Sequence, residues 1–185
     1  MLEPAGVDTV LTLNDYPGIP DIAETGSTFE ENAAIKAEAV CEYTGLPSLA
    51  DDSGLVVDAL GGEPGVYSAR YGGSGLDDHD RYLLLLDKMK GIPQPDRTAR
   101  FVCAMVLSFP GGKSYTRTGT CEGSIAFEPL GEHGFGYDPV FYLSEYDKTM
   151  AQLPPEEKNR ISHRARALDG IAALLEFLSK GKDWK

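Results

Sequence analysis

The sequence holds 185 residues, of which 42% are hydrophobic and 25% are charged. These proportions are typical of globular proteins and predict one domain over residues 1–185. The net charge of −12 argues against partners such as polymeric nucleic acid or anionic membranes. No apolar run approaches the roughly 20 residues of a membrane span. The three cysteines lie far apart, which predicts reduced thiols and a cytoplasmic protein.

The first half of the chain predicts a strand, a helix and further strand segments. Residues 7–13 resemble a short strand. Thr28 and Glu31 form a capping box that begins a helix, and Gly45 is placed to end it. Residues 46–57 have strand character on both sides of an Asp-Asp-Ser-Gly sequence. Residues 61–75 are rich in glycine, which predicts a loop.

The second half of the chain alternates helices with strands. Residues 77–90 predict a helix, and the nearly continuous apolar run 99–109 predicts a central strand. Residues 114–125 alternate more and predict its hairpin partner. A glycine-rich loop then leads to a strand over 140–143, and apolar spacing of three and four predicts one helix over 161–178. The pattern indicates an α/β fold with a mixed sheet.

Positive charge gathers near the end of this acidic chain. Five basic residues and only two acidic ones lie between Lys148 and Arg166. Such a basic segment favours a small polyanionic ligand over a long one. A solvated helix face near a C-terminus explains the same pattern, because the helix dipole favours positive charge there.

Asp51 and Asp52 lie where strand character meets a turn. Neighbouring strand residues point to opposite faces, so only one of the two can face a given site. A carboxylate on a rigid strand end can hold Mg²⁺ or orient a water molecule. Alternatively, both carboxylates accept local backbone hydrogen bonds in a turn.

Lys36 lies on the apolar stripe of the first predicted helix, with Asn32 as its neighbour on the same face. A charge on a buried stripe needs a partner, because an unpaired buried charge is costly. The alternative is that the amine reaches solvent at the edge of the stripe.

Two further segments have side chains suited to contact a planar ring or a carbonyl group. Phe135 stands between two glycines, which allow a ligand to approach closely and the ring to stack, although a tight turn explains the same residues. His163 and Arg164 lie in the basic segment and can donate hydrogen bonds to a carbonyl.

Five motifs in order closely resemble the inosine triphosphatase family, which hydrolyses dITP, ITP and XTP. The match runs from about residue 7 to the end of the chain. The motifs are TFEENAAIKA at 28–37, LADDSGL at 49–55, GGEPGVYSARY at 61–71, GFGYDP at 134–139 and EKNRISHR at 157–164.

The resemblance implies a mixed, elongated sheet with flanking helices, two lobes around a central cleft, and a homodimer. It implies that Asp52 binds Mg²⁺ and activates water and that Lys36 meets the phosphates. The implied substrate-binding residues are Ser53, Phe135, Gly136, Tyr137, Asp138, Lys158, His163 and Arg164.

The hydrogen-bond donors of His163 and Arg164 offer an explanation of selectivity for deaminated purines over adenine. Hypoxanthine and xanthine carry a carbonyl acceptor at C6, where adenine carries an amino donor. A pocket of donors would therefore leave the adenine amino group unpaired.

The start of the chain departs from the family pattern. Family members begin with a strand and a Ser/Thr-x-Asn-x-x-Lys loop that holds the triphosphate, whereas residues 1–4 look like the end of the following helix. This departure predicts an N-terminally truncated domain that binds nucleotide weakly and melts early. Ala23 stands where some members have a second metal-binding glutamate, and Glu24 is its expected substitute.

The predicted function is Mg²⁺-dependent hydrolysis of deaminated purine nucleoside triphosphates to the monophosphate and pyrophosphate. Two alternatives are open. One is a catalytically impaired nucleotide-binding protein, and the other is a Maf-type nucleotide pyrophosphatase, against which the Ser162-His163-Arg164 sequence argues.

Overall fold

A computed structural model describes residues 7–181, so the helix end expected at residues 1–4 lies outside the described residues. The α-helices are α1 (Phe29–Thr44), α2 (Asp78–Lys88), α3 (Pro155–Ile161) and α4 (His163–Gly181). The strands are β1 (Ser48–Val57), β2 (Thr98–Phe109), β3 (Lys113–Ile125), β4 (Phe141–Leu143) and β5 (Lys148–Thr149).

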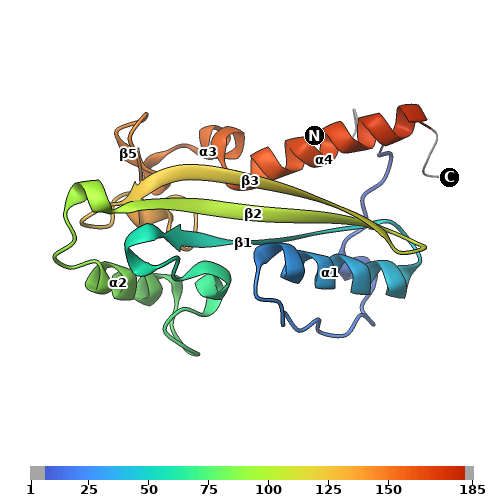
Figure 1. The fold of residues 1–185 in the computed structure, drawn as a ribbon, viewed down its shortest axis with the longest axis horizontal. Helices are drawn as coiled ribbons and strands as arrows, with labels where there is room; N and C mark the ends of the chain where they lie inside the picture. Colours follow the sequence, from blue (N-terminus) through green and yellow to red (C-terminus); the bar gives the residue numbers. More distant parts are fainter. Residues whose placement is uncertain (1–6, 182–185) are drawn as a thin grey trace. The chain divides into compact units, whose positions relative to one another are not determined.

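The strands form one sheet in the order β1-β2-β3-β4-β5, which confirms the predicted α/β class. The β3–β4 and β4–β5 pairs are antiparallel, and β2 runs opposite to β1 and to β3 (Figure 1). Among the described strands the sheet is therefore antiparallel (Figure 1), and not mixed as the sequence predicted. The hairpin predicted for β2 and β3 is present, and β2 has a neighbour on each side, as its apolar sequence predicted.

The chain divides into two compact units. Unit 1 comprises residues 1–52, 103–119 and 166–185, and unit 2 comprises residues 53–102 and 120–165. Each of β1, β2 and β3 supplies residues to both units.

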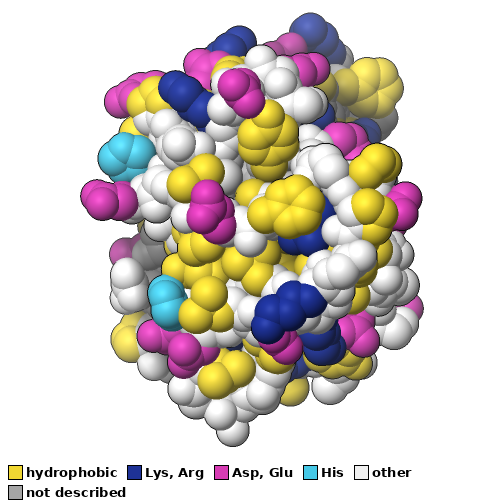
Figure 2. All heavy atoms as spheres, turned by 90° about the vertical axis from the view of Figure 1, so that its left-hand side faces the viewer, with side chains coloured by type: hydrophobic (Ala, Val, Ile, Leu, Met, Phe, Trp, Pro, Cys, Tyr) yellow, Lys and Arg dark blue, Asp and Glu magenta, His cyan; other side chains and the backbone are white. Residues whose placement is uncertain are grey.

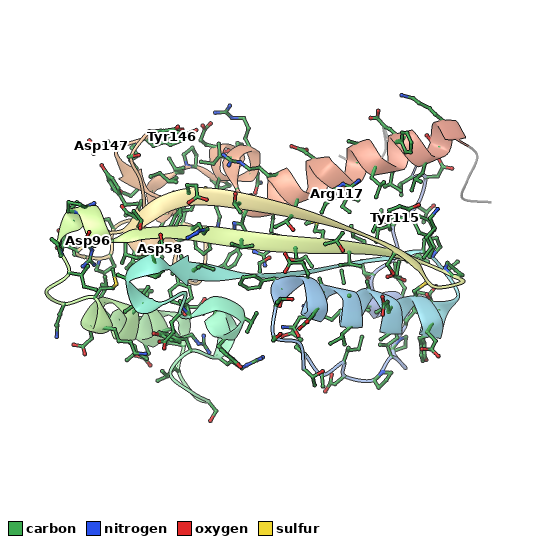
Figure 3. The ribbon with its side chains drawn as sticks, in the orientation of Figure 1. Asp58, Asp96, Tyr115, Arg117, Tyr146 and Asp147 are labelled. Carbon is green, nitrogen blue, oxygen red and sulfur yellow. The ribbon has the colours of Figure 1, made fainter. Side chains whose placement is uncertain are left out.

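In unit 1, α1 and α4 lie on opposite sides of the strands (Figure 1). Every second residue of β2, beginning at Cys103, packs with buried residues of α4 such as Ile171, because alternate strand residues share a face. Arg117 of β3 lies beneath α4 (Figure 3), where a side chain at Gly170 would come within 3.2 Å of its Cδ.

Unit 2 has its own core, to which α2 contributes Leu85 and Met89. Buried Arg97 joins the end of α2 to the end of β3, because its guanidinium donates to the carbonyls of Met89 at 2.9 Å and Ile125 at 2.7 Å. Burial lowers the pKa of Arg97. These contacts fix α2 against the sheet.

Local signals set the ends of α1. The Thr28 hydroxyl accepts the Glu31 N–H at 3.1 Å, as the capping box predicted. The Glu31 carboxylate, however, accepts the N–H of Ser27 at 2.6 Å, one residue before the expected partner. Gly45 ends the helix with φ = 67°, in the left-handed region that glycine adopts without strain.

Three local predictions were wrong. Residues 7–13 do not form a strand, and Val10 is 66% exposed there. Asp51 to Gly54 lie within the continuous strand β1, so no turn separates its halves. The last predicted helix is interrupted at Ser162, which is extended and whose hydroxyl accepts the Ala165 N–H at 3.2 Å. Among the described helices, none combines the length and apolar character that crossing a membrane requires.

Candidate functional site

Four polar residues of unit 1 form what we call the carboxylate cluster, namely Glu24, Asn32, Lys36 and Asp52. Asn32 is fully buried in α1. Its side-chain nitrogen donates to Asp52 Oδ2 at 3.0 Å, and its oxygen accepts the Gly26 N–H at 2.8 Å. A side chain at Gly26 would meet Asn32 Oδ1 at 2.8 Å, so this approach requires glycine. The buried amide thus holds one Asp52 oxygen in a fixed direction.

Lys36 lies between the two carboxylates of the cluster. Its Nζ is 2.6 Å from Glu24 Oε1 and 3.9 Å from Asp52 Oδ1. The side chain is only 24% exposed, so of the two interpretations of Lys36 the paired one holds. Glu24 comes from the segment before α1, and Asp52 from the middle of β1.

Asp51 and Asp52 point to opposite faces of β1, as the strand geometry predicted. Asp52 meets Asn32 of α1. Asp51 instead lies near Cys103, with Sγ 3.8 Å from Oδ2, on the side that packs against α4. Only Asp52 therefore belongs to the carboxylate cluster. Ser53 follows it in β1 and is half-buried.

A second group of residues lies in unit 2, around what we call the recognition loop, residues 134–138. Phe135 is 62% exposed, but Tyr137 and Asp138 are buried. The Tyr137 hydroxyl donates to the carbonyl of Ser68 at 2.9 Å, and burial raises the pKa of Tyr137 well above its usual range. In this structure the Tyr137 and Asp138 side chains support the loop, and Gly134, Phe135 and half-buried Gly136 form its accessible part.

Asp138 determines the conformation of the recognition loop. Its Oδ2 accepts the Phe135 N–H at 2.9 Å and also pairs with Lys158. Gly134 has φ = +83°, and a side chain there would collide with the Asp138 carboxylate. A glycine is therefore required before Phe135.

Phe135 is contacted by two cationic side chains. Lys158 Nζ lies 4.3 Å from the ring centroid, and the Arg164 guanidinium carbon lies 5.5 Å from it. Close by in sequence, buried His163 stacks on Phe101 with the centroids 4.9 Å apart and the rings inclined by 14°. The break at Ser162 places His163 and Arg164 in the first turn of α4. The group combines an accessible aromatic face with hydrogen-bond donors.

The basic segment does not act as one surface. Arg160 pairs with Glu157, whereas Lys158 pairs with Asp138. Lys158 and Arg164 are the two members that meet at Phe135. Acidic, basic and hydrophobic side chains are mixed on the face of the molecule that Figure 2 shows.

Sequence reasoning left three supporting residues out of the candidate site, namely Asn32, Ser68 and Phe101. The position of Asn32 on the same helix face as Lys36 was a usable signal for Asn32. The contacts of Ser68 and Phe101 join distant parts of the chain, such as Ser68 with Tyr137. Ser68 lies in the motif at 61–71, but the local sequence does not indicate its partner.

Comparison with known proteins decides the family. The model of the Ham1 family matches residues 1–174. The chain belongs to the Ham1 family. The resemblance seen in the sequence is thereby confirmed.

Close relatives of this Ham1 chain come from several bacteria. The chain is 55% identical over 173 residues to a dITP/XTP pyrophosphatase of Geobacillus kaustophilus, covering 94% of this chain and 85% of the relative. It is 53% identical over 176 residues to a dITP/XTP pyrophosphatase of Bacillus subtilis, covering 95% and 88%. Among solved structures, the Staphylococcus aureus Ham1 protein has a TM-score of 0.84 and 47% identity, covering 89% of this chain and 84% of that one.

Proposed function

We propose that this Ham1 chain hydrolyses deaminated purine nucleoside triphosphates, namely dITP, ITP and XTP, to the monophosphate and pyrophosphate. The proposal depends on the dITP/XTP pyrophosphatases of Geobacillus kaustophilus and Bacillus subtilis, which are more than half identical to this chain over more than 90% of its length. The match to the Ham1 model over residues 1–174 favours this activity over that of a Maf-type enzyme.

The carboxylate cluster supports the hydrolytic part of the proposal. One water molecule is consumed as the anhydride bond between the α- and β-phosphates breaks, and the water proton must be accepted. We assign that proton to Asp52, whose carboxylate is oriented by Asn32 at 3.0 Å. Lys36 offers a positive charge to the phosphate oxygens.

The same cluster fits a divalent cation such as Mg²⁺. Glu24 and Asp52 place carboxylate oxygens around one ammonium group, and carboxylate oxygens are the protein ligands that Mg²⁺ prefers. Glu24 and Asp52 would hold the ion. When bound, it would neutralise charge on the phosphates and lower the pKa of a coordinated water.

Replacing Lys36 with methionine should separate its pairing with Glu24 and Asp52 from its contact with the phosphates. The ammonium group competes with a cation for Glu24 and Asp52, so without nucleotide Lys36→Met should bind Mg²⁺ about tenfold more tightly. Calorimetric titration with MgCl₂ would measure this change. Turnover of ITP should fall, because the phosphates lose a charge-assisted contact. Lys90→Met is the matched control, since Lys90 pairs with exposed Asp87, and equal affinities in the two variants would contradict the competition.

The residues of unit 2 support recognition of the base. Phe135 presents an accessible ring on which a purine can stack. We assign to His163 and Arg164 the donors for the C6 carbonyl of hypoxanthine or xanthine. Ser53 and Lys158 are proposed as further substrate contacts, and Tyr137 and Asp138 as residues that hold the loop.

Product analysis tests the proposed function. Incubation with ITP and Mg²⁺ should give IMP and pyrophosphate in equal amounts, separated by ion-exchange chromatography, and free phosphate should appear only after inorganic pyrophosphatase is added. Release of IDP with phosphate would contradict the proposal. Binding of ITP without turnover would instead support the catalytically impaired alternative.

We further propose a cytoplasmic homodimer. The resemblance supports the dimer, and Cys41, Cys103 and Cys121, which are buried and form no disulfide, fit a reducing compartment. Light scattering coupled to size-exclusion chromatography would give the mass of the particle in solution.

A further inference from the structure

A residue outside the assigned site holds the accessible part of the recognition loop. The N–H of Gly136 donates to Asp78 Oδ2 at 2.8 Å. Gly136 adopts φ = 61°, in the left-handed region that glycine adopts without strain. The other two anchors use buried side chains, because Asp138 accepts the Phe135 N–H and the Tyr137 hydroxyl donates to the carbonyl of Ser68. Asp78 is the anchor on its accessible side.

Asp78 is itself held in place. It lies in the first turn of α2, where its Oδ1 accepts from Arg81 Nη1 at 2.9 Å. The Arg81 side chain is mostly buried. The opposite end of α2 is fixed in the core through Met89 and by Arg97. A helix fixed at both ends therefore presents the Asp78 carboxylate to the recognition loop, in which glycines lie on both sides of Phe135.

We propose that Asp78, oriented by Arg81, is a positioning residue for purine recognition. The inference rests on the proposed function, because it assumes that Phe135 stacks on the base. By fixing the Gly136 amide, Asp78 fixes the backbone from which the Phe135 ring projects. Its loss frees the backbone at Gly136, whereas Asp138 still holds the Phe135 N–H. Binding a purine must then restore the order at Gly136, so affinity falls. Asp78 does not touch the reacting phosphates and should leave the chemical step unaltered.

The test measures binding of ITP by calorimetry in EDTA, which removes divalent cations and so prevents metal-dependent turnover. Asp78→Ala should raise the Kd for ITP about three- to tenfold, the range expected for one solvent-exposed hydrogen bond. Asp78→Asn keeps an acceptor oxygen and should restore most of the affinity. Asp80→Ala is the matched control, because Asp80 has the same charge in the same turn and its side chain lies beside His79.

A second measurement separates positioning from stability. With ITP and Mg²⁺, Asp78→Ala should raise KM and leave kcat within about threefold, at a melting temperature close to that of Asp80→Ala. Equal Kd values for Asp78→Ala and Asp80→Ala, or absence of ITP binding by the parent, would overturn the inference. Failure of the proposed function has another signature, since the parent would then bind ITP without releasing pyrophosphate.

Discussion

Asp52→Asn should reduce kcat for ITP by about 100-fold or more, because it removes the carboxylate that we assign as base and metal ligand. Asparagine has nearly the same shape, and its side-chain oxygen can still accept from Asn32, whose nitrogen lies 3.0 Å away. The fold should therefore survive. Initial rates at saturating ITP and Mg²⁺, together with a thermal melt, would measure both effects.

Asp51→Asn is the matched control for this experiment. It makes the same chemical change at the neighbouring residue, on the strand face that lies toward Cys103. We expect kcat within a few-fold of the parent. If Asp52→Asn retained activity at the level of Asp51→Asn, Asp52 would not be the catalytic carboxylate.

The preference for ITP over ATP should fall about tenfold or more in His163→Ala and in Arg164→Ala. Each change removes hydrogen-bond donors that can pair with the C6 carbonyl of hypoxanthine but not with the C6 amino group of adenine. One such hydrogen bond contributes about 1.5–3 kcal/mol when the donor is charged. The ratio of kcat/KM for ITP to that for ATP measures the preference. We expect a smaller effect on kcat for ITP at saturation.

Arg160→Ala serves as the control for these two variants. Arg160 belongs to the same basic segment, but its side chain is exposed and pairs with Glu157. Its removal should leave the ITP preference unchanged. Equal losses of kcat/KM for ITP and ATP in Arg164→Ala would indicate that this residue positions the phosphates and does not distinguish bases.

Much of the fold was predictable because its signals are local. The cap at Thr28 and the stop at Gly45 depend on hydrogen bonds and backbone angles within a few residues. The residues between β2 and β3 likewise make a turn that the sequence indicates by itself. The strand predicted for residues 7–13 did not form because strand character is only a propensity, and pairing with another strand decides whether a strand forms.

The candidate site likewise has features that the local sequence predicted and features that depend on contacts between distant segments. The spacing of residues in a strand placed Asp51 and Asp52 on different faces, and the apolar stripe of α1 marked Lys36 as a charge that needs a partner. The identity of that partner was open, because Glu24 approaches Lys36 through the path of the chain before α1. The buried states of Tyr137 and Asp138 also followed from contacts with Ser68 and Lys158, which lie far away in the sequence.

The sequence by itself determined the family, the α/β class and the residue types available for phosphate and purine chemistry, because motif order and hydrophobic periodicity are properties of the chain. Only the tertiary structure decided which of these side chains are accessible and which serve as supports. Burial and hydrogen-bond partners depend on packing between distant segments. Asp78 illustrates this: nothing near it in sequence indicates that its carboxylate receives the amide of Gly136.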